Sequence, residues 1–283
     1  MLLCQKEMSE EIVMNYQILT TSTYAKQILD DNTHGIVHSI YRNTINVSVG
    51  KYLLALQTKN SPLSPISLIT NLGPRQIEKL GLKVGDPIQI LLQNRTEIYN
   101  LSPELVFPKQ FRQELFMKIR RSIISTQTSG FSLIFHHSDS VENDMILRVA
   151  KNRMESAYHF YQKHDFENAC KDLSKLIGLG IGLTPSGDDF LCGILAGLTL
   201  VNRQNHTFTK CLQYYIQQNL KNTNEISQAF LRCALGNHFS YAVNFLWNNP
   251  PLEDITKEFL NIGHSSGIDT LCGIYYALLL WKE

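Results

Sequence analysis

The segment that decides the fold is SGDDFLCGI at residues 186–194, which returns as SGIDTLCGI at residues 266–274. Seven of the nine positions are identical, at a spacing of 80 residues. Two copies are too few for a solenoid and indicate two equivalent helices. Both copies fit the S-x-x-[DE] pattern, in which the serine hydroxyl accepts a hydrogen bond from a backbone amide and the acid lies at the positive helix end. We therefore expect Asp189 and Asp269 to cap two repeated helices.

The residues that follow each copy are apolar nearly all round, which predicts that both helices are buried. Gly193 in the first helix and Gly273 in the second occupy matching positions. Residues without a side chain let two helix backbones approach closely, so the two helices are expected to pack against other helices at these positions.

A glycine-rich loop, GLGIGLTPSG at residues 178–187, precedes the first copy. The segment before it has helical periodicity, so the loop is not a dinucleotide fingerprint, and the Walker pattern is absent. Glycines allow positive φ, and free amides at a helix start bind phosphate or carboxylate. The expected anion-binding residues are Gly180, Gly182, Thr184, Ser186 and Gly187, joined from the second copy by His264, Ser265 and Ser266. If the two helices pack as a pair, their starts face one pocket.

Asp188 differs between the copies, because Ile268 takes its place in the second. A carboxylate beside an anion site repels a second anion, so its useful roles are to accept a hydrogen bond from an –NH₂ group, hold a cation or move a proton. We expect Asp188 to be the catalytic residue, and the alternative is a solvated acid in the first helical turn. The alternative for His264 is a surface or capping residue.

Residues 1–107 have the pattern of β structure. Apolar residues alternate over 45–49, and further strands are expected at 52–56, 67–70, 88–92 and 96–99, with turns between them. Short strands with close turns favour a small antiparallel barrel or sandwich. Residues 108–283 have mostly helical periodicity, including 226–246 and 255–260, with one isolated strand possible at 131–135. The expected fold is α+β, with a domain boundary near residue 107.

Composition narrows the possible partners. Lys and Arg (26) nearly cancel Asp and Glu (25), so the chain has no general attraction for nucleic acid or an anionic membrane. The six cysteines form no C-x-x-C pair, which argues against a zinc site or a disulfide framework. Residues 1–13 show no signal peptide, and the longest apolar runs are too short to span a membrane. We expect a cytoplasmic protein with no cofactor and no metal site, since His34 and His38 lack a third ligand.

At the loop, the chain resembles a bacterial family, the AllH-type subunit of oxamate carbamoyltransferase. The similar segments are GIGLTPSGDDFLCG at residues 180–193 and GHSSGIDTL at residues 263–271, with weaker similarity at 226–236 and near His38. The resemblance implies one subunit of a multi-subunit transferase of purine (allantoin) catabolism. It also implies the reaction of oxalurate with phosphate to give oxamate and carbamoyl phosphate. The Ser-x-Arg-Thr-Arg phosphate motif of better-known carbamoyltransferases is absent.

Three functions remain open at this point. The first is a carbamoyltransferase subunit whose partners are other subunits and a small anionic ureido or carboxylate substrate, or phosphate. The second is a non-catalytic scaffold or assembly subunit, in which the capped helices form a packing core. The third is a magnesium-dependent hydrolase of small amides that uses Asp188 and Asp189 as metal ligands.

Overall fold

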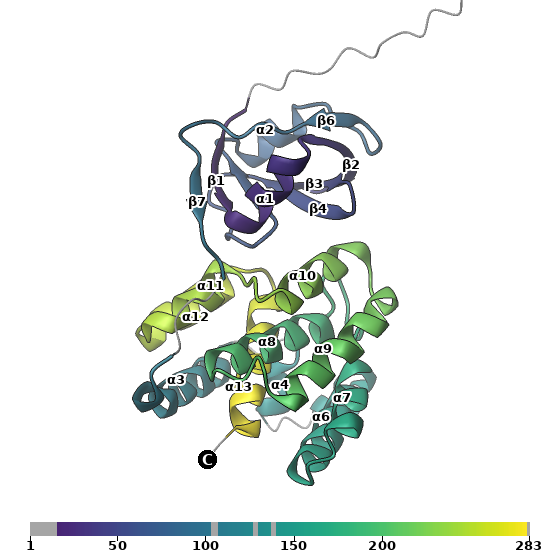
Figure 1. Cartoon of the computed structure of the whole chain (residues 1–283), viewed down its shortest axis with the longest axis vertical. Coiled ribbons are helices and arrows are strands. Elements are labelled where there is room, and N and C mark those ends of the chain that lie inside the picture. Colours follow the sequence, from purple (N-terminus) through teal and green to yellow (C-terminus); the bar gives the residue numbers. More distant parts are fainter. Residues whose placement is uncertain (1–15, 103–106, 127–129, 137–139, 282–283) are drawn as a thin grey trace, which may run out of the picture. The chain divides into compact units, whose positions relative to one another are not determined.

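The computed structural model describes residues 16–102, 107–126, 130–136 and 140–281. The expectation of no signal peptide rests on residues 1–13, and these, together with Cys4, lie outside the described part. The chain divides into two compact units between Asn100 and Leu101 (Figure 1). This division lies a few residues before the predicted boundary near residue 107. The fold is α+β, with a sheet in the first unit and helices in the second.

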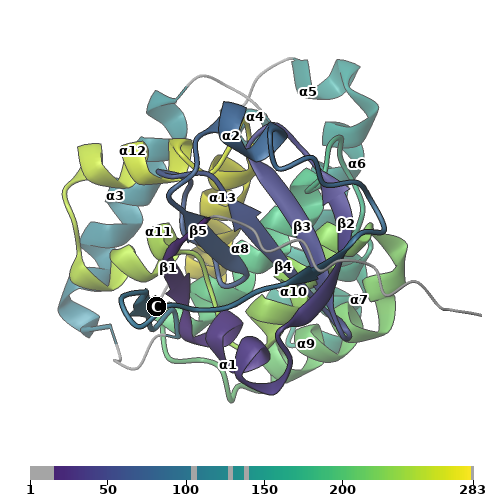
Figure 2. The same cartoon turned by 90° about the horizontal axis from the view of Figure 1, so that it is seen from above.

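The first unit contains one seven-stranded sheet with the strand order β6-β2-β3-β4-β5-β1-β7. The strands are β1 Ile18–Ser22, β2 His34–Ile40, β3 Thr44–Val49, β4 Tyr52–Gln57, β5 Ser67–Thr70, β6 Pro87–Gln89 and β7 Glu97–Tyr99. Two short helices, α1 Thr23–Asp31 and α2 Pro74–Glu78, accompany them. Figure 2 shows β5, β4, β3 and β2 side by side.

The prediction of an antiparallel barrel or sandwich is wrong in two respects. The sheet is mixed, because β4 pairs with β5 in parallel and β1 pairs with β7 in parallel. The sheet is also open, because β6 and β7 lie at opposite ends of the strand order and do not pair with each other. A parallel neighbour needs a connection that returns the chain to the same end of the sheet, and residues 58–66 make that return between β4 and β5.

The predicted hairpin at residues 45–56 is present as β3 and β4. Ile45 lies opposite Leu56, and Val47 lies opposite Leu54. All four side chains are buried, which explains the alternation in the sequence. Gly50 has a φ of +58°, the left-handed conformation that a tight hairpin turn requires.

The second unit is helical throughout its described residues, apart from connecting segments. Its α-helices are α3 Arg112–Ser125, α4 Ser132–Phe135, α5 Ser140–Asn143, α6 Met145–Gln162, α7 Phe166–Ser174, α8 Ser186–Leu200, α9 Thr207–Asn219, α10 Glu225–Leu235, α11 Tyr241–Phe245, α12 Leu252–Leu260 and α13 Ser266–Leu280. The strand considered at 131–135 is absent, since a helical turn lies there. The single run expected over 226–246 is broken after Leu235, where Asn237 adopts a φ of +59°.

The repeated segments form α8 and α13, which lie at the centre of the helical unit in both views (Figures 1 and 2). Their contact is reciprocal. A Cβ on Gly193 would lie 2.0 Å from the carbonyl oxygen of Thr270, and a Cβ on Gly273 would lie 2.0 Å from that of Phe190. Residues 190 and 270 correspond in the repeat, as do 193 and 273, so each helix makes the same contact with the other. This close crossing fixes the positions of the two helix starts.

Candidate functional site

The glycine loop lies between the end of α7 and the start of α8. Gly178, Gly180 and Gly182 adopt φ values of +76°, +137° and +106°, which side chains rarely tolerate. Gly180 also approaches the helix start closely, since a Cβ there would lie 2.5 Å from the nitrogen of Ser186. Glycine is therefore required for the path of this loop.

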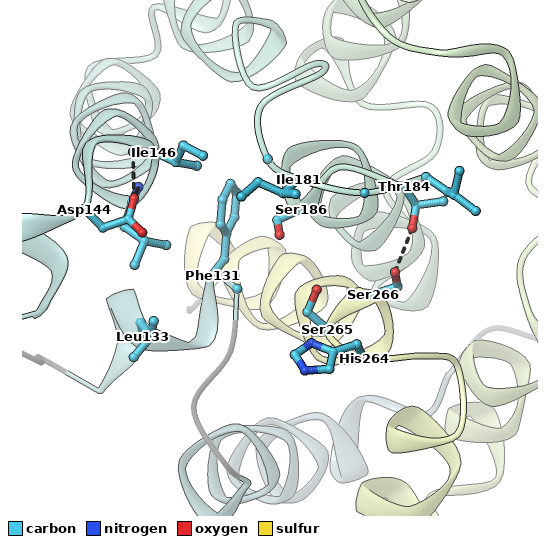
Figure 3. A pocket seen from close by; sticks show the side chains of 15 residues that line it. Phe131, Leu133, Asp144, Ile146, Ile181, Thr184, Ser186, His264, Ser265 and Ser266 are labelled. Carbon is cyan, nitrogen blue, oxygen red and sulfur yellow. Dashed lines mark hydrogen bonds between the residues drawn. The ribbon is translucent and has the colours of Figure 1, made fainter.

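A pocket of about 580 Å³ opens between the loop and the start of α13 (Figure 3). The residues that line it come from four segments of the chain: Gly130, Phe131, Leu133, Asp144, Ile146, Leu147, Gly180, Ile181, Gly182, Leu183, Thr184, Ser186, His264, Ser265 and Ser266. The structure thus brings together both predicted helix starts. It also adds an apolar wall from α4 and α6 that the sequence analysis did not identify.

Four hydroxyl groups line one side of this pocket, and we call Thr184, Ser186, Ser265 and Ser266 the hydroxyl floor. Thr184 Oγ1 and Ser266 Oγ share a hydrogen bond of 2.7 Å. The hydroxyls of Ser186 and Ser265 point toward one another in Figure 3. The floor therefore combines groups from the loop before α8, from α8 itself and from the start of α13.

The predicted capping pairs within each helix are wrong. The N-cap residues are Pro185 and Ser265, and neither makes a side-chain capping bond. The reason is a register difference, because Ser186 and Ser266 are the first residues inside their helices and so do not occupy the N-cap positions.

Each predicted capping acid instead lies beside the serine of the other helix. The hydroxyls of Ser266 and Thr184 lie next to Asp189 and favour its charged form. The hydroxyls of Ser186 and Ser265 do the same for Asp269. Asp189 and Asp269 thus lie behind the hydroxyl floor and link the two helix starts.

Both of these carboxyl groups are buried, with exposed fractions of 9% for Asp189 and 0% for Asp269. Burial raises the pKa of Asp189 well above its ordinary value, and the nearby charge of Asp269 raises it further. Burial likewise raises the pKa of Asp269 to about 6, although the amide of Phe131 donates a 2.6 Å hydrogen bond to its Oδ1. Within the described residues, Oδ2 of each carboxyl group has no hydrogen-bond partner.

Asp188, the residue expected to be catalytic, is 1% exposed and is not among the residues that line the pocket. Its Oδ1 accepts a 2.9 Å hydrogen bond from the amide of Gly178. Its Oδ2 accepts from the hydroxyls of Thr223 at 2.5 Å and Ser227 at 2.6 Å. Burial raises its pKa against these three donors. Through these three hydrogen bonds, the Asp188 carboxylate connects α8 to the glycine loop and to the start of α10. The catalytic role of Asp188 stays a prediction, and these contacts do not support it.

Gly187, expected to bind an anion, uses its amide within the protein, where it donates to the carbonyl of Leu179 at 2.8 Å. A Cβ on this glycine would lie 2.0 Å from the carbonyl oxygen of Leu176. Gly267 in the second copy has the same role, with a Cβ distance of 1.8 Å to the carbonyl oxygen of Phe259. These glycines let each helix start lie against the preceding segment.

All the other residues that were predicted to bind an anion line the pocket: Gly180, Gly182, Thr184, Ser186, His264, Ser265 and Ser266. Among the described residues, none accepts a hydrogen bond from the amides of Gly180, Ile181 or Gly182. Ile181 is 86% exposed, which places this stretch of backbone at the mouth of the pocket. His264 is exposed on the opposite segment. The pocket therefore offers backbone donors on one side and hydroxyl groups on the other.

The described ranges contain no group of three or more His, Cys, Asp or Glu side chains arranged to hold a metal ion. Both oxygens of Asp188 already accept hydrogen bonds from protein donors. The carboxylate of Asp188 is therefore not available as a ligand for the magnesium ion that was considered at Asp188 and Asp189. No helix in these ranges has the length and apolar character needed to span a membrane.

The chain matches two family models. Residues 176–278 match the model of oxamate carbamoyltransferase subunit AllH, and residues 17–105 match the AllH family N-terminal domain. The first match contains the glycine loop, both repeated helix starts and the hydroxyl floor. No solved structure matches the chain. Because the two matches together cover most of the sequence, the chain belongs to the AllH family of oxamate carbamoyltransferase subunits.

Proposed function

We propose that the chain is the subunit of an oxamate carbamoyltransferase that binds the ureido or oxamate substrate, and that the binding site is the pocket between the two helix starts. The reaction is the exchange of oxalurate and phosphate for oxamate and carbamoyl phosphate, as part of purine breakdown. The observation that carries the proposal is the row of amides at residues 180–182, which have no acceptor within the described part of the chain and lie beside a helix start.

In this reaction the bond between the carbamoyl carbon and the oxamate nitrogen breaks, and a phosphate oxygen bonds to the same carbon. The departing nitrogen takes up one proton. Such a transfer depends on orientation and on stabilisation of charge, and it needs no covalent intermediate on the protein. A pocket with amide donors facing an array of hydroxyl groups supplies both.

The proton for the departing nitrogen has one candidate source among the side chains that line the pocket. Asp144 and His264 are the titratable residues there. Asp144 is the N-cap of α6 and accepts hydrogen bonds from the amides of Ile146 and Leu147. His264 has no such structural task in the described part of the chain, and we assign the proton transfer to it.

The scaffold alternative has one observation in its favour. Several of the most distinctive residues of the loop serve packing, because Asp188 and Gly187 make their contacts within the protein. A scaffold subunit would keep these residues and would bind no substrate.

Calorimetry on the full chain separates the two functions. We expect oxamate and oxalurate to bind, and Gly182→Ala to weaken binding about tenfold or more, because a side chain at its positive φ redirects the loop amides. Gly85→Ala is the matched control, since Gly85 also has a positive φ and open space around its Cβ position but lies in the other unit. Absence of binding by oxamate, oxalurate, carbamoyl phosphate and phosphate would favour the scaffold.

A further inference from the structure

The pocket between the two helix starts has an apolar side. Leu133, Ile146, Ile181 and Leu183 line it, and we call these four residues the apolar rim (Figure 3). Ile181 is 86% exposed and Leu183 is 48% exposed, while Leu133 and Ile146 are half-buried. Single exposed apolar side chains are normal on a protein surface, but a group of them around a pocket is typical of an interaction surface.

The backbone holds Ile181 in its outward position. Gly180 and Gly182, on either side of it, adopt φ values of +137° and +106°, which other residues rarely reach. Burial of an isoleucine side chain is favourable, yet the loop keeps this one in solvent. Such a side chain is well placed to contact a second protein.

The pocket is also larger than its proposed substrates. Its volume of about 580 Å³ lies within the range of roughly 300–1,000 Å³ that is typical of sites for drug-sized ligands. Oxalurate and phosphate are much smaller than such ligands, so water fills the remaining space. Water competes with phosphate for the carbamoyl carbon, and covering an active site expels this water. The proposed reaction therefore requires a cover over the pocket mouth.

The pocket lacks a positive side chain for phosphate. Among the described residues that line it, none is a lysine or an arginine, and the titratable residues are Asp144 and His264. The carboxylate of the substrate and the phosphate are both anions, and the reaction brings them close together. Arginine and lysine are the side chains that bind phosphate and stabilise its charge. The exposed carboxylate of Asp144 also attracts such a group.

We propose that the apolar rim is the docking surface for another subunit of the carbamoyltransferase, which covers the pocket mouth with a basic segment. Apolar side chains of that segment contact Ile181 and Leu183, and its arginine or lysine enters the pocket beside Asp144 and binds phosphate. The inference rests on the proposed function and names the partner that completes the same site. The family consists of enzyme subunits, so other subunits exist to supply this segment.

Binding of the other subunits to variants of the full chain tests the docking surface. Ile181→Ser and Leu183→Ser are each expected to raise the Kd for this assembly about tenfold or more in biolayer interferometry, because each removes an apolar contact. Tyr214→Ser is the control, since Tyr214 is 59% exposed on α9 and does not line the pocket. Its Kd should stay within about twofold of the unmodified chain. Equal Kd values for all three variants would overturn the docking surface.

Leu183→Ser also separates this inference from the proposed function. Leu183 supplies no group to the carboxylate site, so the isolated variant is expected to bind oxamate within about threefold of the unmodified chain. Weakened assembly together with this normal oxamate binding supports the inference. If the unmodified chain binds no oxamate, the proposed function fails. Normal oxamate binding with undiminished assembly of both rim variants overturns the inference alone.

Photo-crosslinking identifies what covers the rim. A benzophenone maleimide attached to the thiol of Ile181→Cys in the assembled enzyme is expected to link to a peptide of another subunit that contains arginine or lysine. The same reagent on Tyr214→Cys gives the background. Links from Ile181→Cys to residues 16–102 of the same chain, or to a second copy of it, would show a different occupant and overturn the proposal.

Steady-state kinetics of the assembled enzyme tests the basic side chain. Replacing the arginine or lysine of the linked peptide by methionine is expected to raise the KM for phosphate about tenfold or more, with the KM for oxalurate within about threefold. The isolated chain should bind no phosphate in calorimetry at concentrations that saturate the assembled enzyme. An unchanged KM for phosphate, or phosphate binding by the isolated chain at those concentrations, would overturn the assignment of phosphate to the other subunit.

Discussion

Thr184 and Ser266 share a hydrogen bond that joins the glycine loop before α8 to the first residue of α13, with 2.7 Å between their oxygens. The two residues are far apart in the sequence, and the bond holds together the two helix starts that form the pocket. We expect Thr184→Val and Ser266→Ala each to cost about 1 kcal/mol of unfolding free energy.

A double-mutant cycle measured by urea unfolding checks this link. The coupling energy between the two positions is expected to be about 1 kcal/mol or less, but clearly above zero. Thr199→Val is the control, because Thr199 donates to Leu195 within α8 and does not contact the floor. Its effect should add independently to that of Ser266→Ala.

The crossing of α8 and α13 predicts a large effect of Gly193→Ala. The added methyl group would overlap the carbonyl oxygen of Thr270, so the helices must separate, and we expect a loss of about 2 kcal/mol or more of unfolding free energy. Gly73→Ala is expected to cost less than about 1 kcal/mol, since the nearest atom to its Cβ would be 3.6 Å away. Equal costs for the two variants in thermal unfolding would contradict the close packing described here.

Asp188 offers a direct comparison between a structural and a catalytic role. Asp188→Ala leaves the donors of Gly178, Thr223 and Ser227 without their acceptor, so we expect a loss of about 3 kcal/mol or more of stability. Asp165→Ala, which removes the N-cap of α7, should cost about 1 kcal/mol. A stable Asp188→Asn protein without transferase activity in the presence of its partner subunits would restore the catalytic role.

The raised pKa of Asp269 predicts a pH-dependent stability. In the unfolded chain this carboxyl group titrates near 3.8, and burial moves its pKa in the folded protein to about 6. The folded state therefore binds the proton more tightly, and the group's contribution to stability is full below pH 3.8 and is lost as the pH rises through about 6.

Asp269→Asn removes this titration. The unfolding free energy of the variant, minus that of the unmodified chain, is expected to increase between pH 4 and 6.5 by about 2 kcal/mol and then to level off. Urea unfolding at a series of pH values measures this difference. A difference that does not vary with pH would show that the carboxyl group keeps its ordinary pKa.

His264 is assigned to proton transfer and not to binding. With the partner subunits present, His264→Gln is expected to reduce kcat about 100-fold or more, which is typical of a lost general acid. Oxamate affinity should change less than about threefold, because His264 is exposed at the edge of the pocket. An equal loss in kcat and in affinity would indicate a binding residue instead.

The sequence predicted those parts of the molecule that depend on local pattern. The alternation at residues 45–49 and the apolar stretches after residues 186 and 266 correspond to β3, α8 and α13. The glycines at 180 and 182 predicted a loop that exposes its backbone, because positive φ is a local property.

The predictions that the structure contradicts concern features that depend on contacts between residues distant in the sequence. The S-x-x-D pattern is a local signal, but Asp189 contacts the serine of the other copy, and no single-helix pattern contains that information. Residues 132–135 form a helical turn instead of the expected strand, and the amide of Phe131 just before it bonds to Asp269, which is distant in the sequence. The same contact brings Phe131 into the pocket, so its place there had no signal in the sequence.

A crystal structure of the full chain with oxamate tests the central claim most directly. The ligand is expected between the two helix starts, with its carboxylate on the amides of residues 180–182. Oxamate bound elsewhere on the chain, or bound in this pocket with its carboxylate away from those amides, would contradict the account.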